Sequence, residues 1–150
     1  MNVVDSSAWL EYFADTSQAD YFAQPIEDVN NLIVPTICVL EVFTTVLRQR
    51  GEDAALHAVA VMQQGMVIDL DTTIALSAAK LGVEFKLPLA DSVVLATARA
   101  CDAILWTQDA DFKGIEKASM VLNSFPRKSR GVRLYAPTPV CARHGVIGYL

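Results

Sequence analysis

The sequence has few cysteines and histidines, and they are not arranged as a metal or disulfide site. Cys38, Cys101 and Cys141 are far apart, and none belongs to a CxxC pair or to a zinc spacing that includes His. An odd number of widely separated cysteines is no disulfide framework, so we expect a reducing compartment. His57 and His144 are remote from the candidate serine nucleophiles, which argues against a serine-type hydrolase.

Basic charge and long apolar runs are also scarce. Lys and Arg number 12 against 17 Asp and Glu, which gives a formal net charge of -5. This sign is wrong for a protein whose whole surface binds nucleic acid, so any basic patch is local. No apolar run approaches the roughly 20 residues that span a membrane, and the first residues are not a basic leader. We therefore expect a cytoplasmic protein without a membrane segment.

Apolar residues are abundant, and their pattern predicts an α/β fold. Hydrophobic side chains make up 53% of the 150 residues, which is enough for one core. Apolar runs of strand length alternate with helical segments. Such runs suit an open, mostly parallel sheet of about four or five strands with helices on both faces. Strands are expected at 2–4, 31–34, 66–70, 103–106 and 119–122, and helices at 9–13, 36–50, 52–64, 72–84 and 92–100, with Ser6 or Ser7 capping the first helix.

Four acidic residues fall where such a sheet binds ligands. Asp5 ends the first strand, Asp91 begins a helix, and Asp109 follows a later strand, so all three lie where strand ends meet helix starts. Glu41 can join them, because it lies about one and a half turns past the start of its helix. Carboxylates this close together stay ionised only beside a cation. Oxygen ligands without His or Cys favour Mg²⁺, with Mn²⁺ as a substitute, over zinc.

A cluster of this kind suits phosphodiester hydrolysis, in which one or two metal ions activate a water and stabilise charge on the phosphate. Each acid also has a structural interpretation. Asp5 and Asp91 can cap helices, and Asp109 can close an Asx turn. Glu41 can face solvent and pair with Arg48.

Four stretches carry a resemblance to a known family. They are Val3-Val4-Asp5-Ser6-Ser7-Ala8-Trp9, Val39-Leu40-Glu41-Val42, Leu89-Ala90-Asp91-Ser92 and Trp106-Thr107-Gln108-Asp109-Ala110-Asp111-Phe112. Together they resemble the PIN-domain family, and in particular its VapC-like toxins. The resemblance implies a Mg²⁺-dependent endoribonuclease whose metal-binding and catalytic acids are Asp5, Glu41, Asp91 and Asp109.

The resemblance also implies accessory residues and partners. Thr107 matches a hydroxyl that orients a carboxylate or a water, Asp111 is a substitute or neighbouring group, and Ser6 is a further accessory residue. Such proteins hydrolyse RNA, form homodimers and bind a cognate antitoxin in a groove near the acids. An antitoxin typically supplies an apolar helix and a basic side chain, which would suit an acidic, apolar body.

The last 24 residues differ in composition from the rest. Residues 127–150 contain five basic side chains, no acidic ones, and several Pro and Gly, whereas the preceding residues carry 7 basic and 17 acidic side chains. We expect a PIN-like nuclease domain at 1–126 and a basic extension at 127–150. The extension is either a disordered end or a contact for RNA.

Two other functions are compatible with an α/β fold of this kind. A catalytically silent PIN-fold module that only binds a partner would not need all four acids, which are intact here. A receiver-like phosphoacceptor needs paired acids after the first strand and a Lys after the last. Here Ser6 and Ser7 follow Asp5, and Gln108 and Asp109 follow the later strand, so the charge pattern is wrong for that function.

Overall fold

Five short strands form one sheet in which every pairing is parallel, in the order β3-β2-β1-β4-β5. The computed structural model describes residues 1–115 and 118–120. The predicted parallel α/β fold is confirmed. The strands are β1 (Asn2–Val4), β2 (Leu32–Pro35), β3 (Met66–Ile68), β4 (Ile104–Thr107) and β5 (Ala118–Met120).

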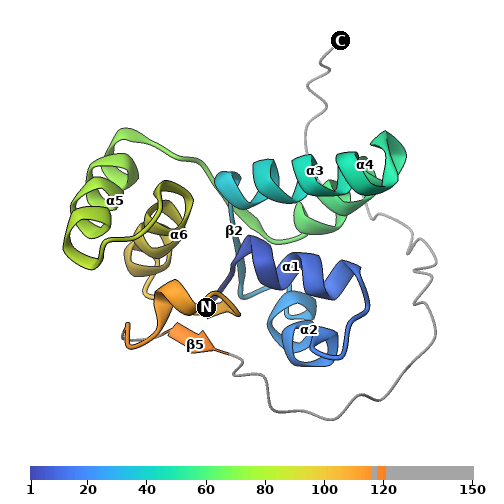
Figure 1. Ribbon diagram of the computed structural model, residues 1–150, viewed down its shortest axis with the longest axis horizontal. Helices are drawn as coiled ribbons and strands as arrows, with labels where there is room; N and C mark the ends of the chain where they lie inside the picture. Colours follow the sequence, from blue (N-terminus) through green and yellow to red (C-terminus); the bar gives the residue numbers. More distant parts are fainter. Residues whose placement is uncertain (116–117, 121–150) are drawn as a thin grey trace.

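Two helices lie between each pair of successive strands from β1 to β4. Figure 1 shows α5 and α6 on one side of the sheet and α1 to α4 on the other. This arrangement follows from the strand order, because the chain moves outward from β1 to β3 and then returns across the sheet to β4. The helices are α1 (Ser6–Phe13), α2 (Ala19–Glu27), α3 (Thr36–Arg50), α4 (Glu52–Met62), α5 (Thr72–Phe85), α6 (Leu89–Ala100) and a 3₁₀ turn η1 (Ala110–Phe112).

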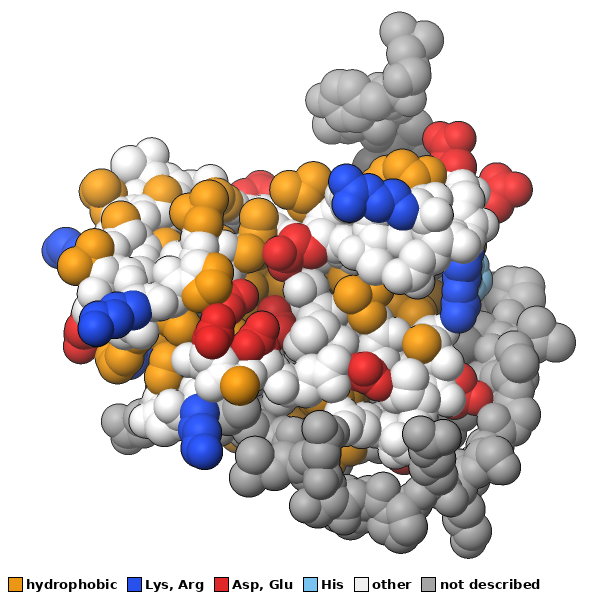
Figure 2. All heavy atoms as spheres, viewed as in Figure 1, with side chains coloured by type: hydrophobic (Ala, Val, Ile, Leu, Met, Phe, Trp, Pro, Cys, Tyr) orange, Lys and Arg blue, Asp and Glu red, His pale blue; other side chains and the backbone are white. Residues whose placement is uncertain are grey.

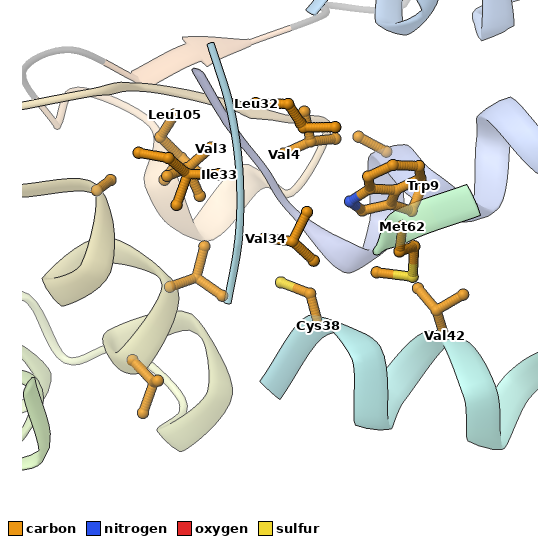
Figure 3. Packing of buried hydrophobic residues seen from close by; sticks show 14 of the residues in the cluster. Val3, Val4, Trp9, Leu32, Ile33, Val34, Cys38, Val42, Met62 and Leu105 are labelled. Carbon is orange, nitrogen blue, oxygen red and sulfur yellow. The ribbon is translucent and has the colours of Figure 1, made fainter. Parts of the chain in front are cut away.

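The core lies between the sheet and the helices that cover it. Val3, Val4 and Ile33 are fully buried on the central strands, and Trp9 is fully buried on α1. Figure 3 shows Cys38 and other side chains of α3 pointing toward these residues. Burying each large apolar side chain contributes about 1.5–3 kcal/mol, so this packing fixes where β1 ends and where α1 and α3 begin.

Several element boundaries differ from those predicted. Helix α2 was not predicted, because Pro25 and several polar residues interrupt its apolar pattern. The strand predicted at 66–70 ends at Ile68, and the strand predicted at 103–106 spans Ile104–Thr107. The helix predicted at 52–64 ends at Met62. The fifth strand begins one residue earlier than predicted. Residues 121–150, including Leu122 and the extension at 127–150, lie outside the described residues.

Two helix starts were predicted wrongly, and both lie near the acids. Asp5, not Ser6 or Ser7, occupies the N-cap position of α1, so both serines are helical residues. Helix α6 begins at Leu89 after Pro88, not at residue 92. Proline has no N–H to leave unpaired and its φ suits a helix entry, so the helix can start immediately after it. Asp91 therefore lies within the first turn of α6.

Length and polarity also bear on membrane insertion. Within the described part of the chain, no helix combines the length and the apolar character needed to cross a bilayer.

Candidate metal centre

The ends of β1 and β4 lie side by side at the centre of the sheet. Val4 pairs with Trp106, and the Asp5 N–H donates to the Trp106 carbonyl at 2.9 Å. β2 lies on one side of β1 and β4 on the other, so the order in which the chain adds strands to the sheet reverses at this point. Ligands of open α/β sheets bind at such a point, beyond the carboxyl ends of the strands.

Asp5 is buried and held by two hydroxyl groups. It is 3% exposed. The Ser7 hydroxyl donates to Asp5 Oδ2 at 2.6 Å, and the Thr107 hydroxyl donates to the same oxygen at 3.0 Å. The Asp5 side chain makes no capping bond to α1, so the capping interpretation of this carboxylate is wrong. Its two donors come instead from α1 and β4, which join it to both elements.

Asp91, Asp109 and Asp111 form the tightest group of acids. One carboxylate oxygen from each lies within 4.8 Å of the others. The Asp109 N–H donates to Thr107 Oγ1 at 2.9 Å, and Asp109 Oδ1 accepts from the Asp111 N–H at 3.0 Å. The Asx-turn interpretation of Asp109 is therefore correct, and it coexists with a place in the acidic group.

Glu41 reaches the same region from α3, where it is half-buried. Its carboxylate hydrogen-bonds with the Ser6 side chain, at the first residue of α1, so pairing with Arg48 does not account for it. One turn earlier on α3, the sulfur of the buried Cys38 accepts a hydrogen bond from the Ser6 backbone. Ser6 is thus tied to two residues of α3, which fixes the start of α1 against the start of α3.

Burial and neighbouring acids raise the pKa of two of these carboxyl groups, Asp91 and Glu41. Burial, followed by the charges of Asp5, Asp109, Asp111 and Glu41, raises the pKa of Asp91 to about 7. Burial also raises the pKa of Glu41, with a further contribution from Asp5, while the hydrogen bond from Ser6 opposes this rise. The five carboxyl groups therefore form one electrostatic cluster, in which added positive charge would be stabilising.

The donor set fits a hard divalent cation. The groups that converge here are carboxylate oxygens, which Mg²⁺ and Mn²⁺ prefer. The neighbouring sulfur of Cys38 is fully buried, and burial together with Asp5 and Glu41 raises its pKa well above the ordinary value, so it remains a neutral thiol. Figure 2 shows acidic side chains gathered near the middle of one face, beside hydrophobic ones.

The structure brings the predicted site residues together, with two differences. Asp111 belongs to the group whose carboxylate oxygens lie within 4.8 Å of one another, together with Asp91 and Asp109. Asp5 and Glu41 are outside this group, although their charges act on Asp91. Ser7 and Cys38 were not predicted to contact the acids. Their spacing could have indicated these contacts, since Ser7 lies two residues after Asp5 and Cys38 lies one helical turn before Glu41.

Comparisons with known proteins agree with this fold. Similar solved structures include a toxin–antitoxin complex from Klebsiella pneumoniae (22% identity, 78% of this chain and 94% of that chain, TM-score 0.68). Another is Mycobacterium tuberculosis VapC20, described as a sarcin–ricin loop cleaving toxin (18% identity, 75% and 92%, TM-score 0.62). A third is VapBC2 from Rickettsia felis bound to a promoter DNA fragment (13% identity, 80% and 96%, TM-score 0.62).

These likenesses concern the fold. A search of functionally curated proteins gave no significant match. The sequence itself matches the family described as PIN domain over residues 3–118, which is most of the chain and includes all five acids. The chain therefore belongs to the PIN domain family.

Proposed function

We propose that the protein is a metal-dependent endoribonuclease and the toxin of a VapBC-type toxin–antitoxin pair. Membership of the PIN domain family and the structural likeness to VapC20, a toxin described as cleaving the sarcin–ricin loop, support this function. The observation that carries the proposal is the convergence of carboxylates from β1, α3, α6 and the segment after β4 on one point of the sheet edge.

In this proposal Asp5, Glu41, Asp91 and Asp109 hold one or two Mg²⁺ ions, with Mn²⁺ as a substitute, and Asp111 is a further ligand. A bound ion would activate a water and stabilise charge on the attacked phosphodiester. Thr107 and Ser7 orient Asp5, and Ser6 orients Glu41. No protein nucleophile is needed, so the side chains serve to position charge rather than to form a bond with RNA.

Cleavage of total RNA by the purified full-length chain tests this function. Wild type is compared with Asp91→Asn, which keeps the size of the side chain, in Mg²⁺ and in EDTA. Asp53→Asn is the matched control, because Asp53 is an exposed acid in the first turn of α4. We expect cutting that requires Mg²⁺, falls by roughly a hundredfold or more in Asp91→Asn, and is unchanged in Asp53→Asn.

Cutting that survives in Asp91→Asn or in EDTA would contradict the proposal and point to a contaminating nuclease. A folded wild-type protein that binds metal but cuts no RNA would favour the partner-binding module instead.

A groove between α1, α3 and α4 is the site that we propose for the antitoxin. It has a volume of about 600 Å³ and combines apolar residues such as Leu10, Phe13 and Val61 with two acids, Glu11 and Asp15, and two basic residues, Arg50 and His57. An amphipathic helix whose charged side chains include a basic one for Glu11 and Asp15 would match this lining. The groove also adjoins the acidic cluster, because Glu11 Oε1 accepts from Gln108 Nε2 at 3.1 Å and Gln108 precedes Asp109.

This partner can be tested with variants of the groove. The tagged chain is purified from cells of its own source, the associated protein is identified by mass spectrometry, and that protein is then made separately. We expect it to block RNA cleavage by wild type and by Leu47→Ala, a control on an exposed part of α3, but to bind Val61→Arg much more weakly. Equal binding to wild type and to Val61→Arg would place the partner elsewhere.

A homodimer is the last part of the proposed function. Leu76 and Val83 on α5 and Leu89 at the start of α6 are 63%, 83% and 81% exposed. Leu76 and Val83 lie seven residues apart on α5 and so share one face of that helix, and exposed large apolar side chains on one face commonly mark an interface. Sedimentation analysis should give a dimer for wild type and a monomer for Val83→Glu, while Leu56→Glu, at an exposed apolar residue of α4, should remain dimeric. A monomeric wild type at micromolar concentration would contradict this assembly.

A further inference from the structure

Both hydrogen bonds to the Asp5 carboxylate end on the same oxygen. Ser7 and Thr107 donate to Oδ2 at 2.6 and 3.0 Å, one from α1 and the other from β4. In the described part of the chain, Oδ1 receives no corresponding side-chain donor, and Asp5 makes no capping bond with this side chain. The carboxylate is therefore held asymmetrically.

This asymmetry limits how the carboxylate can bind a cation. An ionised carboxylate offers about four lone-pair positions, two on each oxygen. The two hydroxyl groups occupy those of Oδ2, so only Oδ1 remains for a metal ion. Bidentate ligation would require Asp5 to give up at least one of the two hydrogen bonds.

The surroundings keep the two donors in place. Thr107 is fully buried, and its hydroxyl also accepts from the Asp109 N–H at 2.9 Å. Ser7 is the second residue of α1, and its carbonyl accepts a long hydrogen bond of 3.5 Å from Gln108 Nε2. The Thr107 side chain therefore cannot turn away from Asp5 without also losing the Asp109 N–H, and the bond from Gln108 holds the backbone of Ser7 beside β4.

We propose that Ser7 and Thr107 make Asp5 a one-oxygen ligand and thereby set the preference of the site for Mg²⁺ and Mn²⁺ over Ca²⁺. Mg²⁺ demands a small octahedral shell and is held by few carboxylate oxygens, whereas Ca²⁺ takes six to eight oxygens and readily uses bidentate carboxylates. Ser7 is in this role a specificity-determining residue. The inference rests on the proposed function only in that it places a divalent cation at these acids.

Ser7→Ala is the informative variant. Ser7 is half-buried on a helix, where Ala is well tolerated, so the fold and the Thr107 bond are retained while one lone-pair position of Oδ2 becomes free. Ser7→Thr keeps the hydroxyl and should behave as wild type. Ser17→Ala is the matched control, because Ser17 is exposed in the loop before α2 and far along the chain from Asp5.

The measurement is binding of Mn²⁺ by electron paramagnetic resonance, with Mg²⁺ or Ca²⁺ added as competitor. We expect the ratio of the Ca²⁺ and Mg²⁺ dissociation constants to fall by about fivefold or more in Ser7→Ala, the change that about 1 kcal/mol produces. Ser7→Thr and Ser17→Ala should keep the wild-type ratio. This readout needs no RNA, so a wild type that binds metal selectively but cuts no RNA would end the proposed nuclease function and leave the inference standing.

Three results would overturn the inference. One is an unchanged ratio in Ser7→Ala, and another is an equal weakening of both ions, which would show a purely structural role. The third is Mn²⁺ binding that is absent in wild type or that Asp91→Asn leaves unchanged, because the acids around Asp5 would then not form a cation site.

Discussion

The Thr107 hydroxyl lies 3.0 Å from Asp5 Oδ2 and joins the end of β4 to the end of β1. The same oxygen of Thr107 accepts the Asp109 N–H at 2.9 Å. One buried hydroxyl thus orients two acids that lie on neighbouring parts of the sheet edge. Its loss should affect both the stability of the fold and the arrangement of the carboxylates.

Replacement of Thr107 separates these effects. Thr107→Val keeps the shape but leaves the buried Asp5 carboxylate without one donor and the half-buried Asp109 N–H without its acceptor, so we expect a loss of about 1–3 kcal/mol in the free energy of unfolding. Thr107→Ser keeps the hydroxyl and should lose less, with Mn²⁺ affinity near wild type. Urea unfolding and Mn²⁺ titration measure the two quantities. Equal stability of Thr107→Val and wild type would mean that water replaces the hydroxyl.

The raised pKa of Asp91 predicts a stability that depends on pH. Between about pH 4 and pH 7 the folded protein retains a proton on Asp91 that the unfolded chain releases, because the pKa is raised from 3.8 to about 7. Without metal, this group therefore favours folding at the acidic end of that range, and its contribution is lost as the pH rises toward 7.

Asp91→Asn isolates this contribution, since Asn carries no titrating proton. In EDTA, the melting temperature of Asp91→Asn minus that of wild type should grow as the pH rises from about 4 to 7. Saturating Mg²⁺ should make this difference in melting temperature negative at pH 7, because the ionised Asp91 carboxylate of wild type then binds the cation. A difference that stays constant with pH would mean that the pKa of Asp91 is near its ordinary value.

Cys38 should resist thiol reagents in the folded protein. It is fully buried, and burial together with the charges of Asp5 and Glu41 raises its pKa, so both access and the thiolate fraction are low. Cys101 is half-buried and serves as the internal comparison. Iodoacetamide at pH 8 followed by peptide mass spectrometry should label Cys101 well before Cys38. Equal labelling rates in the native protein would show that the region around Cys38 opens readily.

The basic extension at 127–150 is proposed to contact RNA. Its five basic residues would offset the repulsion between phosphate and the acidic remainder of the chain. Replacing all five with Gln in the full-length chain should weaken RNA binding and flatten its dependence on salt concentration. Filter binding of a labelled RNA at several salt concentrations measures both effects. Unchanged affinity at low salt would leave the extension without a role in binding.

Much of the fold could be predicted because its strands are short apolar runs with unambiguous ends. Val3 and Val4 lead directly into Asp5, and Leu105 and Trp106 lead into Thr107, so the two strand ends could be placed before their neighbours were known. Helix α2 could not be predicted in the same way, since Pro25 lies inside it and proline normally interrupts a helix; here Pro25 is buried in a helix that packs against α1 and the strands β1 and β2.

The site was predictable in its acids but not in the groups that orient them. Asp5 and Asp109 follow adjacent strands, which their positions in the chain alone suggest. The contact of Ser6 with Glu41 and Cys38 depends on how α1 packs against α3, and helical periodicity does not give that relation. The place of Asp111 depends on the tight turn after Asp109, which brings the two carboxylates to the same side.

The pairing of β1 with β4 has a consequence for biosynthesis. Asp5 and Thr107 are 102 positions apart in the chain, and Asp91, Asp109 and Asp111 also come late. A growing polypeptide on the ribosome cannot assemble the acidic cluster until residues beyond Asp111 have left the exit tunnel. The residues that line the groove between α1, α3 and α4 end at Val61, so the ribosome releases the whole groove-forming segment before it releases the last three acids.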